Sequence, residues 1–175
     1  MNDPVHEFGS VLSVDAEAIG QPGQRRFRLL VLSSYGAAWV WMEKEQLSGI
    51  GTWLTETVEK LDVDRPTAEP DAEPLPFPAE VDVDISAGQL ALGYVEDRDV
   101  FAIQVYDLQA AAGEQQARPL FRCFLGRGQS RVLGRKIAKV VAGGRPPCPL
   151  CGEPMDPSGH VCPRSNGHRD VRLTQ

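Results

Sequence analysis

Residues 41–54, "WMEKEQLSGIGTWL", and residues 124–137, "FLGRGQSRVLGRKI", show the pattern that decides the fold of this chain. Each stretch begins at the apolar end of a predicted strand and continues with apolar residues at helical spacing. An offset of 83 residues places Gln46 on Gln129, Gly51 on Gly134 and Leu54 on Ile137. Both halves of the chain are therefore predicted to end as a strand followed by a helix with a matching entry.

This correspondence has two explanations. The chain can contain a duplicated unit of strands followed by a helix. Alternatively, two unrelated strand-to-helix junctions share the same apolar spacing, since few of the aligned residues are identical. The sequence leaves both explanations open.

The segments before each junction are short apolar or alternating runs separated by Gly-rich or polar turns, which is typical of strands joined by tight connections. The predicted strands are 6–19, 25–34, 37–43, 80–86, 89–96, 100–108 and 119–126, and the predicted helices are 44–61 and 128–142. Runs of strands precede each helix, so the predicted class is α+β, with a largely antiparallel sheet and two packed helices.

Residues 62–80 are rich in proline and acidic residues. Proline lacks a backbone donor and fixes φ, so this stretch is predicted to be an extended linker or surface loop. With 175 residues, of which 42% are hydrophobic, the chain can form one ordinary core and a small appended module. We expect an α+β domain over residues 1–142 that contains the linker, and a metal module over residues 143–175.

The stretch "CPLCGEPMDPSGHVC", residues 148–162, indicates a metal site. Cys148 and Cys151 have the spacing at which one tight turn directs two thiolates to the same ion, and Gly152 suits the left-handed conformation of such a turn. In a strand over "HVC", His160 and Cys162 project to the same side. Cys148, Cys151, His160 and Cys162 are therefore the predicted ligands of one structural zinc ion.

His168 is the alternative fourth ligand. The strand direction favours His160, because His168 requires a longer ordered loop. A redox-active "CPLC" pair, a disulfide and thiols without a metal are further alternatives, but prolines and a turn follow the pair where a redox motif has a helix. Cys123 lies in an apolar strand and is predicted to be a core residue.

The charge of the chain is divided unevenly. Residues 118–175 carry eleven basic and three acidic residues, a net charge of plus 8, whereas residues 1–117 carry a net charge of minus 14. The predicted second helix shows a cationic stripe, and with Arg164 it forms the predicted anion- or partner-binding set: Arg127, Arg131, Arg135, Lys139 and Arg164. Attraction between the stripe and the acidic first part of the chain is the simpler explanation of the same pattern.

Two weaker candidate sites remain. Asp82, Asp84 and the acidic residues of "EDRD" resemble magnesium ligands, although alternating Asp is also typical of a half-exposed strand. The "GRGQS" stretch, residues 126–130, resembles a phosphate-binding loop, although one such Gly pair is common. Neither pattern predicts a catalytic residue.

The N-terminal stretch "MNDPVHEFGS" shows no secretory signal, and no apolar run is long enough to span a membrane. A cytoplasmic location is therefore expected, in which clustered thiols are metal ligands before they are disulfides.

The C-terminal third resembles a known family. "CPLCG", "GHVCPR" and Asn166-Gly167, preceded by a strand and the "RGQSRVLGRKIAKVV" helix, are similar to the zinc-ribbon-like end of an uncharacterised actinobacterial family, domain of unknown function 3090. The resemblance covers the whole chain in length and order but implies no activity. Genes of the family tend to lie beside those of a lipid-kinase-like protein, a histidine-phosphatase-like protein and the mycothiol ligase, so a kinase-like protein is an implied partner.

Taken together, these patterns predict a non-enzymatic, zinc-containing binding or adaptor protein whose partner is a protein. A small enzyme acting on a phosphorylated substrate and a nucleic-acid-binding protein are the alternatives. The strongly acidic first part and the lack of aromatic residues within the cationic stripe disfavour nucleic acid.

Overall fold

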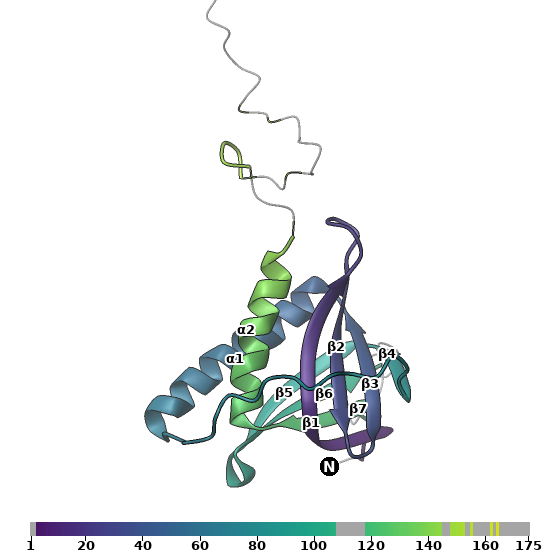
Figure 1. The fold of residues 1–175 in the computed structure, drawn as a ribbon, viewed down its shortest axis with the longest axis vertical. Coiled ribbons are helices and arrows are strands. Elements are labelled where there is room, and N and C mark those ends of the chain that lie inside the picture. Colours follow the sequence, from purple (N-terminus) through teal and green to yellow (C-terminus); the bar gives the residue numbers. More distant parts are fainter. Residues whose placement is uncertain are drawn as a thin grey trace, which may run out of the picture.

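The computed structural model describes residues 3–107, 118–144 and 148–152, together with Met155, Cys162 and Arg164. In this part of the chain, one seven-stranded sheet packs against two α-helices (Figure 1). The elements are β1 (His6–Ile19), β2 (Arg26–Ser33), β3 (Gly36–Met42), α1 (Lys44–Asp64), β4 (Val83–Ser86), β5 (Gln89–Val95), the 3₁₀ turn η1 (Glu96–Arg98), β6 (Val100–Tyr106), β7 (Phe121–Leu125) and α2 (Arg127–Ala142). The predicted α+β class with two packed helices is confirmed.

The fold repeats one unit of three strands and a helix. In the first repeat, β1, β2 and β3 form an antiparallel meander that leads into α1. In the second repeat, β5, β6 and β7 form the same meander and lead into α2. The helices begin at Lys44 and Arg127, which are the positions that the offset of 83 residues aligns. The structure therefore repeats a strands-then-helix unit, which is one of the two explanations that the sequence left open.

Two long, bent segments join the repeats into a closed sheet. The first segment is β1, and the second is β4 followed by β5. The first part of β1 runs parallel to β7, and from Val11 onward β1 runs antiparallel to β2. In the same way, β4 runs parallel to β3, and β5 runs antiparallel to β6. β4 and β5 are the two ends of the strand order β4-β3-β2-β1-β7-β6-β5, yet only Ala87 and Gly88 separate them in the chain. The sheet therefore closes on itself through this connection.

Four strand pairs are antiparallel, as expected for a largely antiparallel sheet, but the β1–β7 and β3–β4 pairs are parallel. Both parallel pairs join strands that are distant in sequence, so no local turn pattern predicts them. The β1–β7 pair is also the strand pair that connects the first repeat to the second.

A glutamine at the same place in each repeat fixes the start of the helix. The Gln46 side chain accepts a hydrogen bond from the Glu43 backbone amide at 2.9 Å and donates one to the Gly88 carbonyl at 2.9 Å. The Gln129 side chain accepts from the Gly126 amide at 3.0 Å and donates to the Val11 carbonyl at 3.0 Å. Val11 lies at the bend of β1, and Gly88 lies at the bend between β4 and β5. Each glutamine therefore connects the start of its helix to a bend of the sheet by a hydrogen bond.

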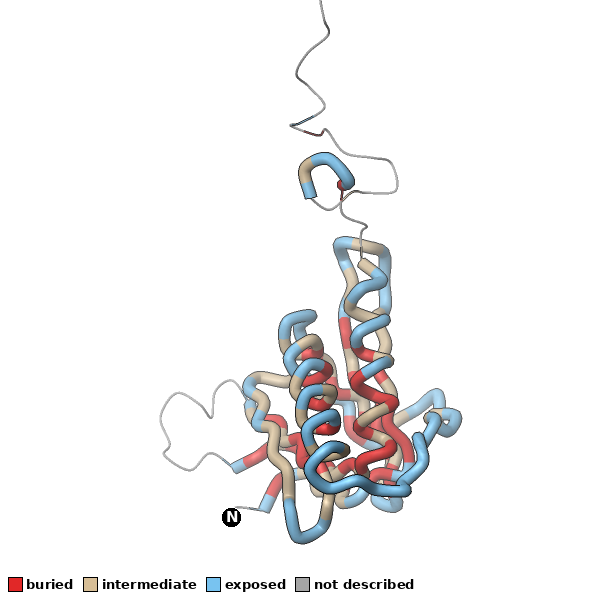
Figure 2. Tube along the Cα trace, turned by 90° about the vertical axis from the view of Figure 1, so that its left-hand side faces the viewer, coloured by how far each residue is buried: buried red, intermediate tan, exposed pale blue. Residues whose placement is uncertain are grey.

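The helices cross where their backbones approach closely. A Cβ atom added to Gly51 would lie 2.5 Å from Ile137 Cγ2, and one added to Gly134 would lie 2.7 Å from Thr55 Oγ1. Gly51 and Gly134 are equivalent positions of the two repeats, so the crossing is nearly symmetric. Below it, one hydrophobic core combines residues of both repeats, among them Leu29, Leu54 and Phe101 (Figure 2).

Residues 65–80 cross the outside of the fold, and we call them the strap. In Figure 1 the strap leaves the end of α1, passes α2 and the first strands, and reaches β4. No residue of the strap is buried, and none is in a helix or strand. Its neighbour beyond α2 is β1, since the Leu75 amide donates to the Ser13 hydroxyl at 2.8 Å. Residues 62–64, which the sequence analysis assigned to the linker, form the last turn of α1 instead.

Candidate metal centre and basic helix

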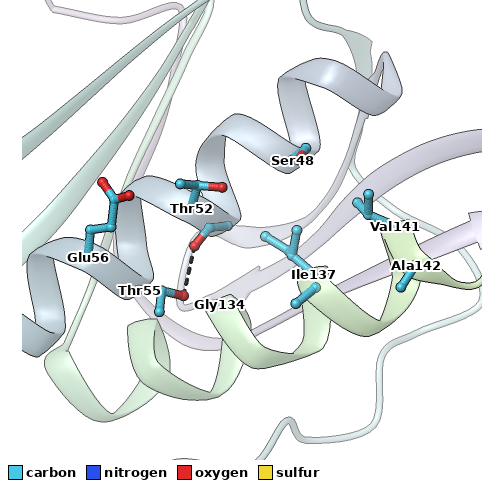
Figure 3. Close-up of a pocket in the computed structure, with 10 residues that line it drawn as sticks. Ser48, Thr52, Thr55, Glu56, Gly134, Ile137, Val141 and Ala142 are labelled. Atoms are coloured by element: carbon cyan, nitrogen blue, oxygen red, sulfur yellow. Dashed lines mark hydrogen bonds between the residues drawn. The ribbon is translucent and has the colours of Figure 1, made fainter.

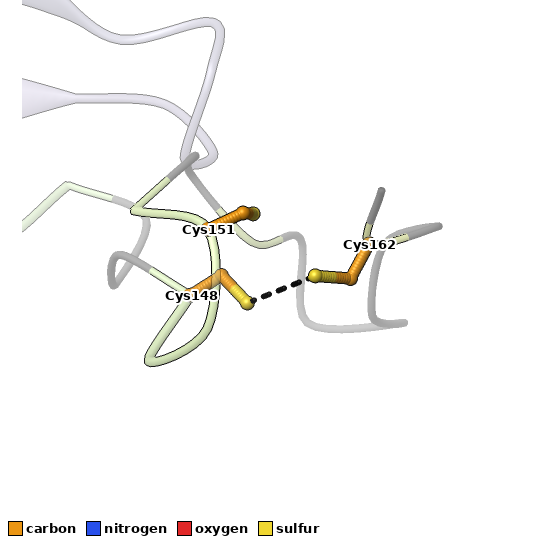
Figure 4. Close-up of side chains that lie close together, drawn as sticks. All are labelled: Cys148, Cys151 and Cys162. Carbon is orange, nitrogen blue, oxygen red and sulfur yellow. Dashed lines mark hydrogen bonds between the residues drawn. The ribbon is translucent and has the colours of Figure 1, made fainter. Parts of the chain in front are cut away.

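Three of the four cysteines gather beyond the end of α2. The Sγ atoms of Cys148, Cys151 and Cys162 all lie within 4.8 Å of one another (Figure 4). Cys148 and Cys162 are buried, and Cys151 is half-buried. The turn thus directs two thiols to one point, as the spacing predicted, and Cys162 meets them from farther along the chain.

The local backbone explains the turn. Gly152 has a φ of 79°, the left-handed region that favours glycine, and its amide donates to the Cys148 carbonyl at 2.9 Å. The Leu150 amide points at Cys148 Sγ at 3.4 Å. Backbone hydrogen bonds from Cys151 and Leu150 lower the pKa of the Cys148 thiol, so the turn favours the thiolate that a metal requires.

The spacing of two of the sulfurs is compatible with a shared metal ion. Cys148 Sγ and Cys162 Sγ are 3.8 Å apart. Zinc binds thiolate at about 2.3 Å, so two sulfurs of a tetrahedral site are about 3.8 Å apart, whereas a disulfide requires about 2.05 Å. The cluster can therefore hold a metal ion through three thiolates, which leaves one tetrahedral position for another ligand.

The two histidines predicted as the fourth ligand, His160 and His168, lie outside the described residues. Cys123 lies elsewhere, fully buried in β7, where burial raises the pKa of its thiol. It belongs to the hydrophobic core, as predicted.

The structure places Arg127, the first residue of the predicted stripe, in the interior. Its side chain is 2% exposed and donates to the Asp99 carboxylate at 2.7 Å and to the Arg65 carbonyl at 2.6 Å. Leu61 and Asp62 in the last turn of α1 also accept hydrogen bonds from it. Because α1 has no basic residue in its last turn, Arg127 supplies positive charge to the carbonyl end of that helix.

The backbone conformation and the hydrogen bonds of Asp99 favour its contact with Arg127. It is the one non-glycine residue with positive φ, 50°, among the described residues, and it accepts a second hydrogen bond from the Tyr94 hydroxyl at 2.6 Å. Burial alone would raise the pKa of Asp99, but the hydrogen bonds from Tyr94 and Arg127 outweigh burial, and the net direction is downward. The carboxylate is therefore an anionic partner that holds Arg127 in place.

Arg131 and Arg135 also contact carboxylates of the same chain. Arg131 lies 3.1 Å from Asp62 and 2.7 Å from Asp71, and Arg135 pairs with Asp71 as well. Hydrogen bonds from these two arginines lower the pKa of the Asp71 carboxyl. The structure thus shows the internal attraction that was the simpler explanation of the charge pattern.

Arg135, Lys139 and Arg164 are the exposed members of the predicted set. Arg164 donates to the Leu150 carbonyl at 2.9 Å, which places its charge beside the cysteine turn. Lys139 lies one turn beyond Arg135 on α2.

The amides of the "GRGQS" stretch are occupied by the strap. The Glu69 carboxylate accepts from the Gly128 amide at 3.0 Å and from the Arg127 amide at 3.3 Å. The sequence analysis did not predict that Glu69 or Asp71 contacts these residues. An acidic linker that precedes a basic helix is the pattern that could have indicated such contacts.

A family comparison adds to this geometry. The model of a family described as "Protein of unknown function (DUF3090)" matches residues 6–162. The chain belongs to this family. Comparisons with curated proteins and with solved structures gave no match. The region shared with the DUF3090 family contains both repeats, the strap and all three clustered cysteines, and it includes His160 but not His168.

In this member of the DUF3090 family, the acidic residues considered as magnesium ligands have contacts within the chain. Asp82 accepts from the Ala37 amide at 2.9 Å, Asp84 accepts from the Trp41 indole at 2.7 Å, and Glu96 pairs with Arg65. These contacts support the strand and turn structure, and the described metal-ligand cluster is formed by cysteines instead.

A cavity of about 420 Å³ lies along the helix crossing (Figure 3). Its lining includes Ser48, Thr52 and Val141, and Glu56 is its one carboxylate. The Thr55 hydroxyl in this lining donates to the Gly51 carbonyl at 2.9 Å.

Of the helices in the described part of the chain, none has the length and apolar character needed to cross a membrane.

Proposed function

We propose that this chain is a zinc-containing binding protein that acts as an adaptor for another protein. The observation that carries the proposal is the group of three thiols within 4.8 Å of one another. With an imidazole as fourth ligand, the site is closed, and a closed zinc site stabilises structure rather than performing catalysis.

His160 is the proposed fourth ligand. Support comes from its place two residues before Cys162 and inside the region that matches the family. Zinc then organises residues 143–175 as a module attached to the α+β domain of residues 1–142. When bound, the ion crosslinks segments that contain too few apolar residues to form a core of their own.

The partner is proposed to be a protein, for which the lipid-kinase-like neighbour is the first candidate. The basic charges of α2 and of the cysteine module support this assignment, because an acidic partner surface complements them. A cytoplasmic location follows from the same proposal, since reduced thiols are needed to bind the metal.

Metal analysis of the full chain tests the metal part. We expect one zinc per chain, lost in Cys151→Ser and in His160→Ala and retained in Cys123→Ala, whose thiol is in the core. Limited proteolysis after chelation is expected to cleave the module first. Retention of zinc in His160→Ala with loss in His168→Ala would reassign the fourth ligand, and no metal in the wild-type chain would overturn the proposal.

Co-purification with the lipid-kinase-like neighbour tests the partner. We expect Lys139→Glu to weaken the complex, whereas Lys60→Glu, an equally exposed charge reversal on α1, retains it. Equal retention by both variants would show that the basic end of α2 is not the binding surface.

A further inference from the structure

One face of α2 already holds an extended acidic segment. The face consists of the Arg127 and Gly128 amides, Arg131 and Arg135, and we call it the basic face. The strap occupies it through the Glu69 carboxylate on the two amides and the Asp71 carboxylate on the two arginines. Arg131 also donates weakly to the Glu69 carbonyl at 3.5 Å. The face therefore binds side-chain and backbone oxygens of an extended chain.

The shape of the face suits close approach of such a chain. A Cβ atom added to Gly126 would lie 2.7 Å from Glu69 Oε1, and one added to Gly128 would collide with the Pro70 carbonyl. Neither glycine has positive φ, so backbone conformation does not require glycine at these positions. The absence of side chains here instead makes room for the segment that lies on the helix.

The strap itself is held weakly. Residues 65–73 are all exposed, so almost no apolar burial fixes this part of the strap. The Arg135 and Asp71 side chains remain 51% and 39% exposed, and ion pairs between exposed side chains stabilise a fold only slightly and are screened by salt. An occupant with so little buried area can be replaced by a similar segment of another protein.

We propose that the basic face of α2 is a docking surface for an extended acidic segment of the partner protein, and that the strap covers it as an internal ligand in the free chain. This inference rests on the proposed adaptor function and names the chemistry of the partner. The partner segment places one carboxylate on the amides at the start of α2 and a second one between Arg131 and Arg135. Binding requires that the strap leaves, so the strap reduces the affinity of the free chain for its partner.

Space for a longer segment continues along the helix. A cavity of about 310 Å³ lies between the strap and α2, and its lining includes Glu73 and Pro74 of the strap, Arg135 and Lys139 of α2, and Asp15 of β1. Lys136 pairs with Asp15 at 3.5 Å, which leaves Lys139 as the next basic side chain toward the end of the helix. A partner segment with a third acidic residue would contact Lys139.

Fluorescence anisotropy with a labelled synthetic peptide of residues 66–78 tests the proposal. The protein is the full chain, either wild type or with the strap weakened by Glu69→Gln and Asp71→Asn. We expect the weakened chain to bind the peptide at least about tenfold more tightly than the wild type, because its own strap no longer competes. Arg135→Glu added to the weakened chain is expected to abolish binding, and 0.5 M salt to weaken it strongly. The matched control Lys60→Glu is expected to leave binding unchanged.

A second peptide, with its three acidic residues replaced by amides, separates charge from shape and is expected not to bind. Thermal unfolding of each variant verifies that it is folded. Equal peptide affinity for the wild-type and weakened chains, binding that survives Arg135→Glu, or no saturable binding to the weakened chain would each overturn the proposal. Binding of a single-stranded oligonucleotide in place of the peptide would overturn it as well.

The two proposals can fail separately. If the chain holds zinc and captures its neighbour but binds no acidic peptide, the adaptor function stands and the docking surface lies elsewhere. If the weakened chain binds the peptide but holds no zinc, the docking surface stands and the metal function fails.

Discussion

The starts of α1 and α2 are equivalent places in the two repeats, but they obtain their negative charge differently. α1 has Glu43 at its N-cap and Glu45 in its first turn. α2 has Gly126 at its N-cap and no acidic residue in its first turn, so Glu69 of the strap supplies the carboxylate. A carboxylate at a helix N-terminus is favourable because the amides there carry partial positive charge. One repeat is thus self-sufficient at this point, and the other depends on a removable segment.

The C-terminal end of α1 also depends on a charged group from outside its own repeat. Its last turn has no basic residue, and the buried Arg127 of the second repeat supplies one. Arg127 of the second repeat therefore completes α1, and Glu69 of the strap completes α2. These contacts indicate that neither repeat is a complete folding unit.

The largest expected effect is on a fragment of residues 1–64, which contains the first repeat alone. It loses the parallel contact of β1 with β7 and the part of the shared core that β4, β6, β7 and α2 supply. We expect no cooperative thermal transition by circular dichroism. A fragment that melts cooperatively would show that the first repeat is an independent domain.

The next effect is at the helix crossing. Gly134→Val introduces a branched side chain where the Thr55 hydroxyl already limits the space, and we expect a loss of about 2–3 kcal/mol in the free energy of unfolding. Gly49→Ala, in α1 and with no atom within 4 Å of the added Cβ, is the control and is expected to gain up to about 1 kcal/mol. Chemical denaturation measures both, and equal stabilities would contradict the close crossing.

Gln46 and Gln129 make equivalent hydrogen bonds in the two repeats. Gln46→Ala and Gln129→Ala each remove two hydrogen bonds at a bend of the sheet. We expect each substitution to cost about 1–2 kcal/mol in the free energy of unfolding. A neutral Gln129→Ala beside a destabilising Gln46→Ala would mean that the strap, rather than the glutamine, fixes the start of α2.

The smallest effect concerns pH. The pKa of Asp71 is lowered in the folded chain by hydrogen bonds from Arg131 and Arg135, so its contribution to stability is present above the ordinary Asp pKa and is lost as the pH falls through the lowered value. We expect protease cleavage within the strap to increase below about pH 4, the region of the unperturbed Asp pKa. Asp71→Asn should show fast cleavage already at neutral pH. An unchanged cleavage rate in that variant would contradict the role of Asp71.

The sequence predicted those parts of the molecule whose signals are local. The class, the two helices and the antiparallel pairs with short connections follow from apolar spacing and turn signals, and the thiol cluster follows from the spacing of Cys148 and Cys151. The parallel β1–β7 pair, the burial of Arg127 and the partners of Glu69 join residues that are far apart in the chain. Their energies depend on tertiary placement, which neither periodicity nor charge counts contain.

Amide hydrogen exchange at the two helix starts tests most directly the claim that the strap supplies what α2 lacks. In Glu69→Gln, we predict that the Gly128 and Arg127 amides exchange at least about fivefold faster, since the neutral amide holds them less strongly than the carboxylate does. The amides of the first turn of α1, which the strap does not contact, are predicted to keep their wild-type rates. Unchanged exchange at Gly128, or an equal increase in both helices, would contradict the account.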